Sequence, residues 1–239
     1  LEPGALFVTL SGSKTDGHRY VAQALEKGAA AILCREPPRT GSWLSTPYPR
    51  AALARVSAAW FGYPGEEMTL IGVTGTNGKT TTTYLIKAML EGALKTRVGL
   101  IGTNRNLIGA LELPAHRTTP EPYELQALLR RMADAGCTHV VMEVSSQAYK
   151  VDRVYGLTFD VAAFLNISPD HISPIEHPTF EDYLHCKRQI VKNCRALVLG
   201  ADCARADLIR QDARHASVPV TTFALGGDST ADVMATPAN

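Results

Sequence analysis

A glycine-bearing loop between an apolar run and a helical stretch constrains this chain more than any other feature of its sequence. Thr69-Leu70-Ile71-Gly72-Val73 has the pattern of a buried strand, and Lys79-Thr80 opens a helix rich in Thr, Leu, Ile and Met. Small residues between them let backbone N–H groups face an anion, and the helix N-terminus adds a partial positive charge. This order of elements is the context of a phosphate-binding loop. The residues that we expect to bind ATP are therefore Gly75, Thr76, Asn77, Gly78, Lys79, Thr80 and Thr81.

Two side chains of this loop have expected roles. Lys79 would reach the β- and γ-phosphates, and the Thr80 hydroxyl would bind Mg²⁺. The usual pattern has a further glycine where Val73 stands, so the match is imperfect. The alternative is an ordinary strand–turn–helix with incidental glycines. It is less favoured, because Gly-Lys-Thr falls at the strand–helix junction.

The chain divides into two predicted domains. Its 239 residues exceed one average domain, and Tyr63-Pro64-Gly65 breaks the pattern. We place the boundary there, between residues 1–65 and residues 66–239. The first part predicts a small N-terminal α/β domain, with strands at 6–10 and 29–34, helices at 18–27 and 51–61, and a loop at 36–49.

From Met68 onward, short apolar runs alternate with helical stretches. This alternation predicts a P-loop-type ATPase domain, with a parallel sheet covered by helices on both faces. Ligands of such sheets bind beyond the carboxyl ends of the strands. The expected strands span 69–73, 98–101, 139–144, 159–165, 196–199 and 218–223, and the expected helices span 79–91, 122–135, 180–193 and 205–215.

Charge and cysteine content exclude several classes of protein. A formal net charge of +1 gives no reason to expect nucleic acid or a membrane as partner. The five cysteines are scattered without a CxxC pair, which predicts reduced thiols in the cytoplasm and not a disulfide framework or a zinc site. No apolar run approaches the ~20 residues of a membrane span. We expect a cytoplasmic monomer.

A single carboxylate, Glu143, interrupts the apolar run at residues 140–144. A lone Glu in a buried strand is costly unless it is paired or bound to a metal. In nucleoside-triphosphate enzymes, an acidic residue at the end of a neighbouring strand completes the Mg²⁺ site. We expect Glu143 to take this role; the alternative is a strand that ends early and leaves the carboxylate solvated.

Two later segments carry further candidates. Asn166, Asp170 and His171 follow the run at 159–165. A His there could bind a metal or a phosphate, although a single His at a strand end is more often only hydrogen-bonded. A helix then begins at Thr179 with a capping-box pattern, and Lys187 falls on its apolar face. Such a lysine usually extends outward, but in a sheltered site it can lose its proton and react.

In their order along the chain, these motifs resemble those of the Mur ligases of peptidoglycan synthesis, and among them the UDP-N-acetylmuramoyl-tripeptide synthetase type. The resemblance covers nearly the whole chain, and its combination of motifs is specific although each motif alone is not. The matching residues are Gly75 to Thr80, Glu143-Val-Ser-Ser146, Asn166, Asp170-His171 and Lys187. Further matches are Pro3 to Val8, Asp16-Gly17, Arg117 to Pro120 and Asp152 to Val154.

The resemblance implies an ATP-dependent, ADP-forming ligase. ATP would phosphorylate the D-glutamate carboxylate of UDP-MurNAc-L-Ala-D-Glu. The amine of L-lysine or meso-diaminopimelate would then attack the acyl phosphate. One Mg²⁺ would be held by Thr80 and Glu143, and a second by His171 and by Lys187 as a carbamate (N6-carboxylysine). The implied catalytic residues are Lys79, Lys187, His171 and Glu143.

Other ligand contacts are also implied by the resemblance. Asn166 matches a residue that contacts the nucleotide base. The residues implied for the UDP-sugar peptide are Ser13, Lys14, Thr15, Thr118, Thr119, Ser145 and Arg153. Without the family, the Thr-Thr pair is typical of a polar turn, and the arginine of a surface charge. Departures from the family at Arg117, Gln147 and Val151 affect fine substrate contacts and leave the reaction class unchanged.

The family's third, carboxyl-terminal domain, which selects the amino acid and closes over ATP, has no counterpart here, and neither does the segment expected before Leu1. We therefore expect the chain alone to bind its ligands weakly and not to turn over. The alternatives are another ligase of the group (folylpolyglutamate or D-glutamate-adding), a P-loop kinase or GTPase switch, and a non-catalytic nucleotide-binding module. The motif pairing, the lack of a water-activating or base-reading motif, and the intact Lys79, Thr80 and Glu143 argue against them in turn.

Overall fold

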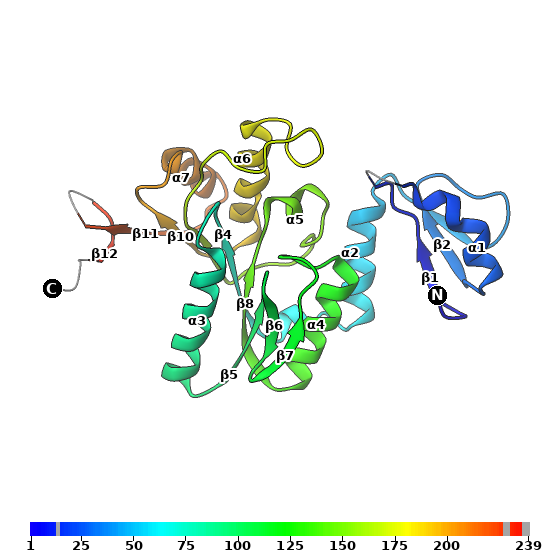
Figure 1. Cartoon of the computed structure of the whole chain (residues 1–239), viewed down its shortest axis with the longest axis horizontal. Helices are drawn as coiled ribbons and strands as arrows, with labels where there is room; N and C mark the ends of the chain where they lie inside the picture. The colour runs from blue at the N-terminus through cyan, green and yellow to red at the C-terminus, as the bar shows by residue number, and fades with distance from the viewer. Residues whose placement is uncertain (13–14, 227–229, 236–239) are drawn as a thin grey trace.

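The computed structural model describes residues 1–12, 15–226 and 230–235 of the chain. A small three-stranded sheet forms near the N-terminus, and a nine-stranded sheet forms the larger part of the molecule (Figure 1). Among the residues described, none of the helices has the length and apolar character of a membrane span.

The small sheet has three parallel strands, β1 (Leu6–Val8), β2 (Ala31–Cys34) and β3 (Trp43–Ser45). Its core is formed by β2 and α1 (Val21–Glu26), which follows the short 3-10 helix η1 (Gly17–Tyr20). The loop predicted at 36–49 is wrong, because β3 lies inside it. All three residues of β3 are exposed, so backbone pairing with β2 and not an apolar pattern makes this edge strand.

Helix α2 (Pro49–Trp60) joins the small sheet to the larger unit. It begins with proline, which suits the first helical turn because proline lacks an N–H group there. It packs against α4 (Pro122–Asp134) (Figure 1). The rings of Phe61 and Tyr123 lie 5.1 Å apart at this contact. A 3-10 turn, η2 (Pro64–Glu66), then leads into the central strand. The domain boundary at residue 65 stays a prediction.

The large sheet has the strand order β12-β11-β10-β9-β4-β8-β5-β6-β7. All neighbouring strands are parallel except the β5–β6 and β6–β7 pairs, so the predicted parallel P-loop-type sheet is confirmed. The strands are β4 (Thr69–Thr74), β5 (Arg97–Ile101), β6 (Arg105–Ile108), β7 (Leu111–Pro114), β8 (Cys137–Glu143), β9 (Val161–Phe164), β10 (Leu197–Gly200), β11 (Val220–Leu225) and β12 (Val233–Ala235).

The β6–β7 hairpin was not predicted from the sequence. Its two-residue turn contains Gly109 at φ +59°, the positive dihedral that tight hairpin turns require. The strands are short, and Leu111 is exposed, so the hairpin lacks a strong apolar pattern. It caps one edge of the parallel sheet.

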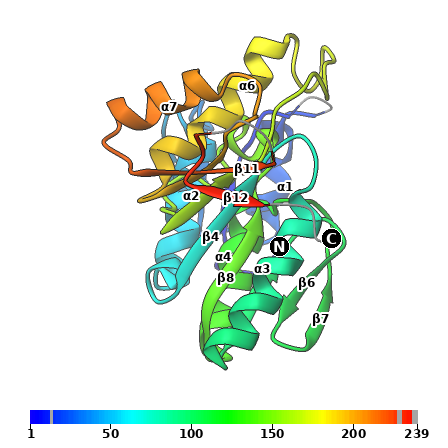
Figure 2. The ribbon, with the colours of Figure 1, turned by 90° about the vertical axis from the view of Figure 1, so that its left-hand side faces the viewer.

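Helices cover both faces of the large sheet, as predicted. One face packs against α4, α6 (Phe180–Arg188), the 3-10 helix η3 (Gln189–Asn193) and α7 (Ala206–His215). The other packs against α3 (Lys79–Leu94), which lies alongside β4 and β8 (Figure 2). Residues of β8 alternate between the faces: Val140 and Met142 join the larger core, while Val141 faces α3. The short helix α5 (Ser146–Lys150) follows β8 and was not predicted.

This topology brings separate motifs to one edge. Strand β4 lies between β8 and β9, and all three run in the same direction. The segments that follow them therefore meet at the carboxyl edge of the sheet. These segments carry the glycine loop, Ser145 and Asn166.

We expect Leu129→Ala to lower the free energy of unfolding by about 2–5 kcal/mol, because a fully buried α4 side chain is removed and a cavity remains. Denaturant-induced unfolding of the purified chain measures this change. Leu85→Ala on α3 is the control, since that side chain is 59% exposed and its loss should change stability little. Equal effects of the two variants would contradict the assignment of the core.

Candidate active site

The loop between β4 and α3 is shaped by two glycines. Gly78 precedes α3 at φ +83°, a left-handed conformation that side chains disfavour. A Cβ on Gly75 would lie 3.1 Å from Leu165 Cβ, a tight contact that would require Leu165 to shift. The segment after β9 holds the loop: the N–H of Thr76 donates to the Asn166 carbonyl (3.1 Å), and the N–H of Asn77 donates to Asn166 Oδ1 (3.0 Å).

Two lysines converge on one carbonyl oxygen of this loop. Lys79 Nζ donates to the oxygens of Gly75 (2.9 Å) and Thr76 (3.0 Å). Lys187 Nζ reaches across from α6 and donates to the same Gly75 oxygen at 2.8 Å. Lys187 is only 1% exposed, so the predicted inward orientation is confirmed. Its chemical role stays a prediction.

The surroundings of Lys187 favour the neutral amine. Burial, followed by the neighbouring Lys79, lowers the pKa of Lys187 from 10.5 to about 7. Burial also lowers the pKa of Lys79, against the attraction of Glu143 and Asp170. The ring of Tyr183 lies 4.9 Å from Lys187 Nζ. A large share of Lys187 is therefore unprotonated, and able to react as a nucleophile, near neutral pH.

Glu143 is buried and hydrogen-bonded, so the alternative of a solvated carboxylate is wrong. Its Oε1 accepts hydrogen bonds from Thr80 Oγ1 (3.0 Å) and the N–H of Thr103 (2.9 Å), and Oε2 accepts one from Thr103 Oγ1 (3.0 Å). A carboxylate beside a threonine hydroxyl is an oxygen donor set of the kind that Mg²⁺ prefers.

Sequence reasoning missed the two residues that make room for this carboxylate. Thr103 follows β5 and binds both oxygens of Glu143. A side chain at Gly102 would collide with Glu143 Oε1. The sequence did contain a signal for these residues, because Gly102-Thr103 follows an apolar run as Glu143 does. The structure shows why the two meet, since β5 pairs with β8.

His171 is not part of this carboxylate group. Its side chain is half exposed, its backbone has φ +54°, and its Nδ1 lies 2.9 Å from Glu176 Oε2. Its ring centroid is 6.2 Å from that of Tyr183, whose ring also faces Lys187. Burial lowers the pKa of both lysines, and the neighbouring Asp170 opposes part of that lowering in each.

Thr119 and Ser145 join the end of β8 to the segment before α4. The buried Thr119 hydroxyl donates to the carbonyl of Glu143 (2.9 Å) and accepts from the N–H of Ser145 (3.1 Å). Ser145 in turn caps α5. The hydroxyls of Thr118 and Thr103 lie 3.0 Å apart. Thr119 thus positions Ser145, while Thr118 lies beside the Glu143 group.

The other expected substrate residues lie in two places. Arg153 is mostly buried and is not a free surface charge: its guanidinium binds Glu121 (Nε at 3.0 Å) and the carbonyl of Thr119 (3.3 Å). Thr15 is exposed in the small unit, and its carbonyl accepts a hydrogen bond from the N–H of Gly12. Ser13 and Lys14 lie outside the described residues.

A cavity of about 270 Å³ is lined by the glycine loop, Glu143 and Thr118. The residues that line it are Thr76, Asn77, Gly78, Lys79, Thr80, Thr81, Thr103, Thr118 and Glu143.

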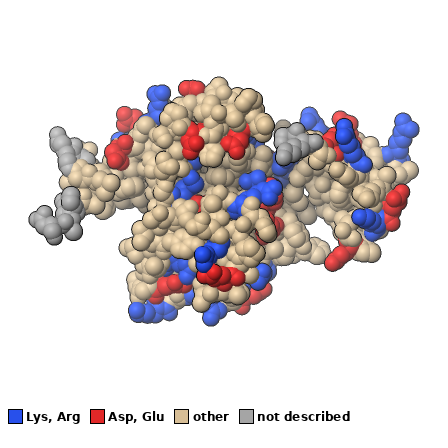
Figure 3. All heavy atoms as spheres, viewed as in Figure 1, with Lys and Arg blue, Asp and Glu red and all other residues tan. Residues whose placement is uncertain are grey.

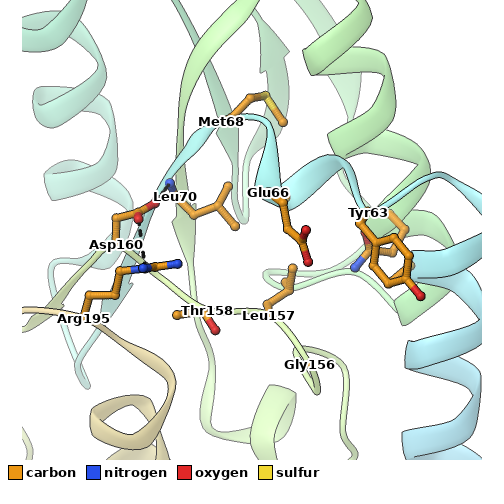
Figure 4. A pocket seen from close by; sticks show the side chains of 12 residues that line it. Tyr63, Glu66, Met68, Leu70, Gly156, Leu157, Thr158, Asp160 and Arg195 are labelled. Carbon is orange, nitrogen blue, oxygen red and sulfur yellow. Dashed lines mark hydrogen bonds and ion pairs between the residues drawn. The ribbon is translucent and has the colours of Figure 1, made fainter.

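A second cavity, of about 260 Å³, lies near the amino ends of the central strands (Figure 4). None of the expected site residues lines it. Asp160 accepts a hydrogen bond from the N–H of Leu70 at the start of β4 (2.9 Å) and pairs with Arg195 (3.3 Å). These groups satisfy one another, which favours a structural role at this end of the sheet.

Charge on the visible surface is mixed. Basic and acidic side chains are interspersed over the face in Figure 3, with no extended region of one sign. This distribution agrees with the formal net charge of +1.

Two family models match the chain. One, described as the Mur ligase middle domain, matches residues 73–238, and one described as the Mur ligase family, catalytic domain, matches residues 1–59.

Curated relatives and a solved structure give the same result. The UDP-N-acetylmuramyl-tripeptide synthetase of Bifidobacterium longum is 56% identical over 80% of the chain. The UDP-N-acetylmuramoyl-L-alanyl-D-glutamate--2,6-diaminopimelate ligase of Chlorobium phaeobacteroides is 45% identical over 86%. The chain spans 38% and 41% of the lengths of these relatives. A solved structure of another 2,6-diaminopimelate ligase superposes with a TM-score of 0.81 at 28% identity, covering 98% of this chain and 48% of that one.

We expect Lys187→Met to stabilise the purified chain by an amount that grows as the pH falls from 10.5 to about 7. Between these values the unfolded state binds more protons at Lys187 than the folded state does, so lowering the pH favours unfolding of the wild type. Below the folded pKa the difference becomes constant. Denaturant unfolding at stepped pH, in buffer free of CO₂, measures it.

Lys192→Met is the matched control, because Lys192 is exposed near the end of the same helical segment. Its stability over the same pH range is the baseline for the comparison. A flat profile for Lys187→Met against this baseline would mean that the buried amine keeps its ordinary pKa.

Proposed function

Because the chain belongs to the Mur ligase family, we propose that it carries the ATP and substrate sites of an amide ligase in peptidoglycan synthesis. The reaction adds a diamino acid, L-lysine or meso-diaminopimelate, to UDP-MurNAc-L-Ala-D-Glu. The names of the two relatives support this substrate class. In this proposal, residues 1–65 bind the UDP end of the substrate, and residues 66–239 bind ATP.

One observation carries the proposal: Lys79 and Lys187 meet at the Gly75 carbonyl, at the loop whose Thr80 binds Glu143. One buried and one half-buried amine, with one buried carboxylate, around a glycine loop suit a polyanion bound together with a divalent cation. A switch GTPase or a simple nucleotide binder has no evident use for a lysine brought in from a distant helix.

Mg²⁺ fits the residues present. The partners of the Glu143 carboxylate are hydroxyl and N–H groups, which a cation and its waters can replace. Thr80 and Glu143 would hold one ion. His171 and a carboxylated Lys187, which both lie near the Tyr183 ring, would hold a second. Bound Mg²⁺ supplies charge neutralisation at the phosphate oxygens.

The protein's own groups align and stabilise the reactants. Lys79 would exchange its loop carbonyls for phosphate oxygens and oppose the charge that develops on them. The γ-phosphoryl group passes to a carboxylate oxygen of D-glutamate, which leaves ADP and an acyl phosphate. The incoming amine then attacks the acyl carbon; phosphate leaves, the amine loses a proton, and an amide forms. Asn166, which holds the loop at Asn77, would turn to the nucleotide base.

The substrate peptide would lie on the side of the cavity lined by Thr118. Ser145 is held in place by Thr119, and Arg153 is oriented by Glu121. These contacts support roles for all four expected residues near this edge, with Thr119 acting through Ser145. Ser13, Lys14 and Thr15 would bind the UDP end.

We also propose that the protein works in the cytoplasm as a monomer. All five cysteines are free and buried, which agrees with a reducing compartment. Its partners are the UDP-dipeptide, ATP and the amino acid, without nucleic acid or membrane.

The full-length gene product that contains this chain should release phosphate from ATP only when the UDP-dipeptide and an accepted diamino acid are both present. Lys79→Met should lower kcat by at least about 100-fold, because a charge that stabilises the transferring phosphoryl group is lost. A coupled phosphate assay with L-lysine and meso-diaminopimelate in turn measures this. Lys192→Met serves as the exposed control. Phosphate release independent of the UDP-dipeptide would sink the ligase assignment.

Lys187 should gain about 44 Da in bicarbonate buffer at alkaline pH, the mass of CO₂ added to an unprotonated amine. Intact-protein and peptide mass spectra after trapping of the carbamate detect this gain. It should be lost at acidic pH and be absent from Lys187→Met. An unmodified Lys187 at saturating bicarbonate and Mg²⁺ would refute the carbamate.

A further inference from the structure

A network of hydrogen bonds centred on a buried histidine lies outside the glycine loop and links two parts of the site. Its centre is His177, which is fully buried and has a partner on each ring nitrogen. Nδ1 lies 2.6 Å from Asp182 Oδ2, and Nε2 lies 2.8 Å from Ser146 Oγ. None of these three side chains belongs to the site residues expected from the sequence.

At one end, this network of hydrogen bonds holds the turn that carries Ser145. Ser146 is the first residue of α5 and directly follows Ser145, whose N–H is bound by Thr119. The far end of α5 is tied to the same group, because Lys150 Nζ lies 2.8 Å from Asp182 Oδ2. Helix α5 is therefore fixed at both ends.

At the other end, the network of hydrogen bonds holds α6, the helix that carries Lys187. Asp182 and Tyr183 lie in its first turn, and Lys187 lies one turn after Tyr183. The His177 ring packs edge-on against Tyr183, with 5.2 Å between centroids and an angle of 68°. The hydroxyl of Tyr183 lies 3.2 Å from Thr76 Oγ1, and its ring faces Lys187. His177 thus supports a side chain that contacts both the loop and Lys187.

Direct chemistry at these residues conflicts with their burial. Ser146 is 4% exposed and His177 is fully buried, so a substrate carbonyl has no access to a Ser–His–Asp relay. Cys186 lies close enough to complete a His–Asp–Cys metal cluster. However, both nitrogens of His177 and Oδ2 of Asp182 already have partners. We therefore consider a role for these residues in positioning other groups of the site.

We propose that His177 is a positioning residue. It fixes the turn at Ser145, which we expect to contact the substrate, relative to helix α6, which carries Lys187. The proposal rests on the proposed function and deepens it, because it assigns the relative positions of the substrate-binding turn and the Lys187 helix to one imidazole. A rigid ring with two polar atoms can bind both sides at once, which an aliphatic side chain cannot do.

The test uses the full-length gene product and two separate titrations, one with Mg²⁺ and a non-hydrolysable ATP analogue, one with UDP-MurNAc-L-Ala-D-Glu. His177→Leu should weaken both affinities about tenfold, the effect of losing buried hydrogen bonds on each side. Ser146→Ala should weaken only the UDP-dipeptide. His177→Gln, whose amide reaches the position of Nε2, should recover most of the UDP-dipeptide affinity and not that of the nucleotide.

Combining Ser146→Ala with His177→Leu should cost no more UDP-dipeptide affinity than His177→Leu alone, because both changes break one link. His185→Gln is the control: it makes a matched change at an exposed position of the same helix and should leave both affinities unchanged. Circular dichroism verifies folding; should His177→Leu not fold, Ser146→Ala and His177→Gln still decide the matter.

The proposal would be overturned if Ser146→Ala and His177→Leu lowered the UDP-dipeptide affinity additively. It would also be overturned if His177→Leu lowered the melting temperature but left both affinities unchanged. Either result would leave His177 with a merely structural role. The titrations need no turnover, so they separate this proposal from the proposed function. If the wild type binds the nucleotide but not the UDP-dipeptide, the ligase assignment fails. The nucleotide titrations of His177→Leu and His177→Gln then still support or overturn the positioning role.

Discussion

The Gly75 carbonyl oxygen, which accepts hydrogen bonds from both Lys79 and Lys187, is the contact on which the rest of the site depends. Lys79 comes from the helix that follows the loop, whereas Lys187 comes from α6, more than 100 residues further along the chain. The absence of a side chain at Gly75 lets Leu165 and Asn166 lie close to the loop, and the central position of β4 places the loop between the ends of β8 and β9. Burial of both lysines disfavours their charge, so the pair suits an anion that arrives later.

Glu143 is the opposite charge in this arrangement, and it too is held by small groups. Gly102 leaves space for its carboxylate, and Thr80 and Thr103 bind it from two directions. Such a site stabilises the fold poorly, because buried charges lose hydration. The large core under α4, α6 and α7 offsets that cost. Stability and chemistry are thus separated: both faces of the sheet pack against helices, and the residues of the proposed site lie at its carboxyl edge.

Sequence patterns predicted the parts of the fold that have strong periodicity or caps. The helix that begins at Thr179, with the N–H of Asp182 bound to the Thr179 hydroxyl, is one example. The strand β3 escaped because all three of its residues are exposed, and the β6–β7 hairpin escaped because its strands are short and β7 has no buried residue. Thr103 escaped for another reason: its importance comes from a partner, Glu143, that is 40 residues away in sequence.

By itself, the sequence determined the phosphate loop, the order of strands and helices around it, and the family, since these depend on local patterns and on motifs in a fixed order. Only the tertiary structure decided that Lys187 reaches the loop, that Glu143 is buried beside Thr103, and that His171 turns toward Glu176. It also joined Ser146, His177 and Asp182. The reason is geometric: side chains from different strands and helices meet only where parallel strands end together, and no local pattern records that meeting.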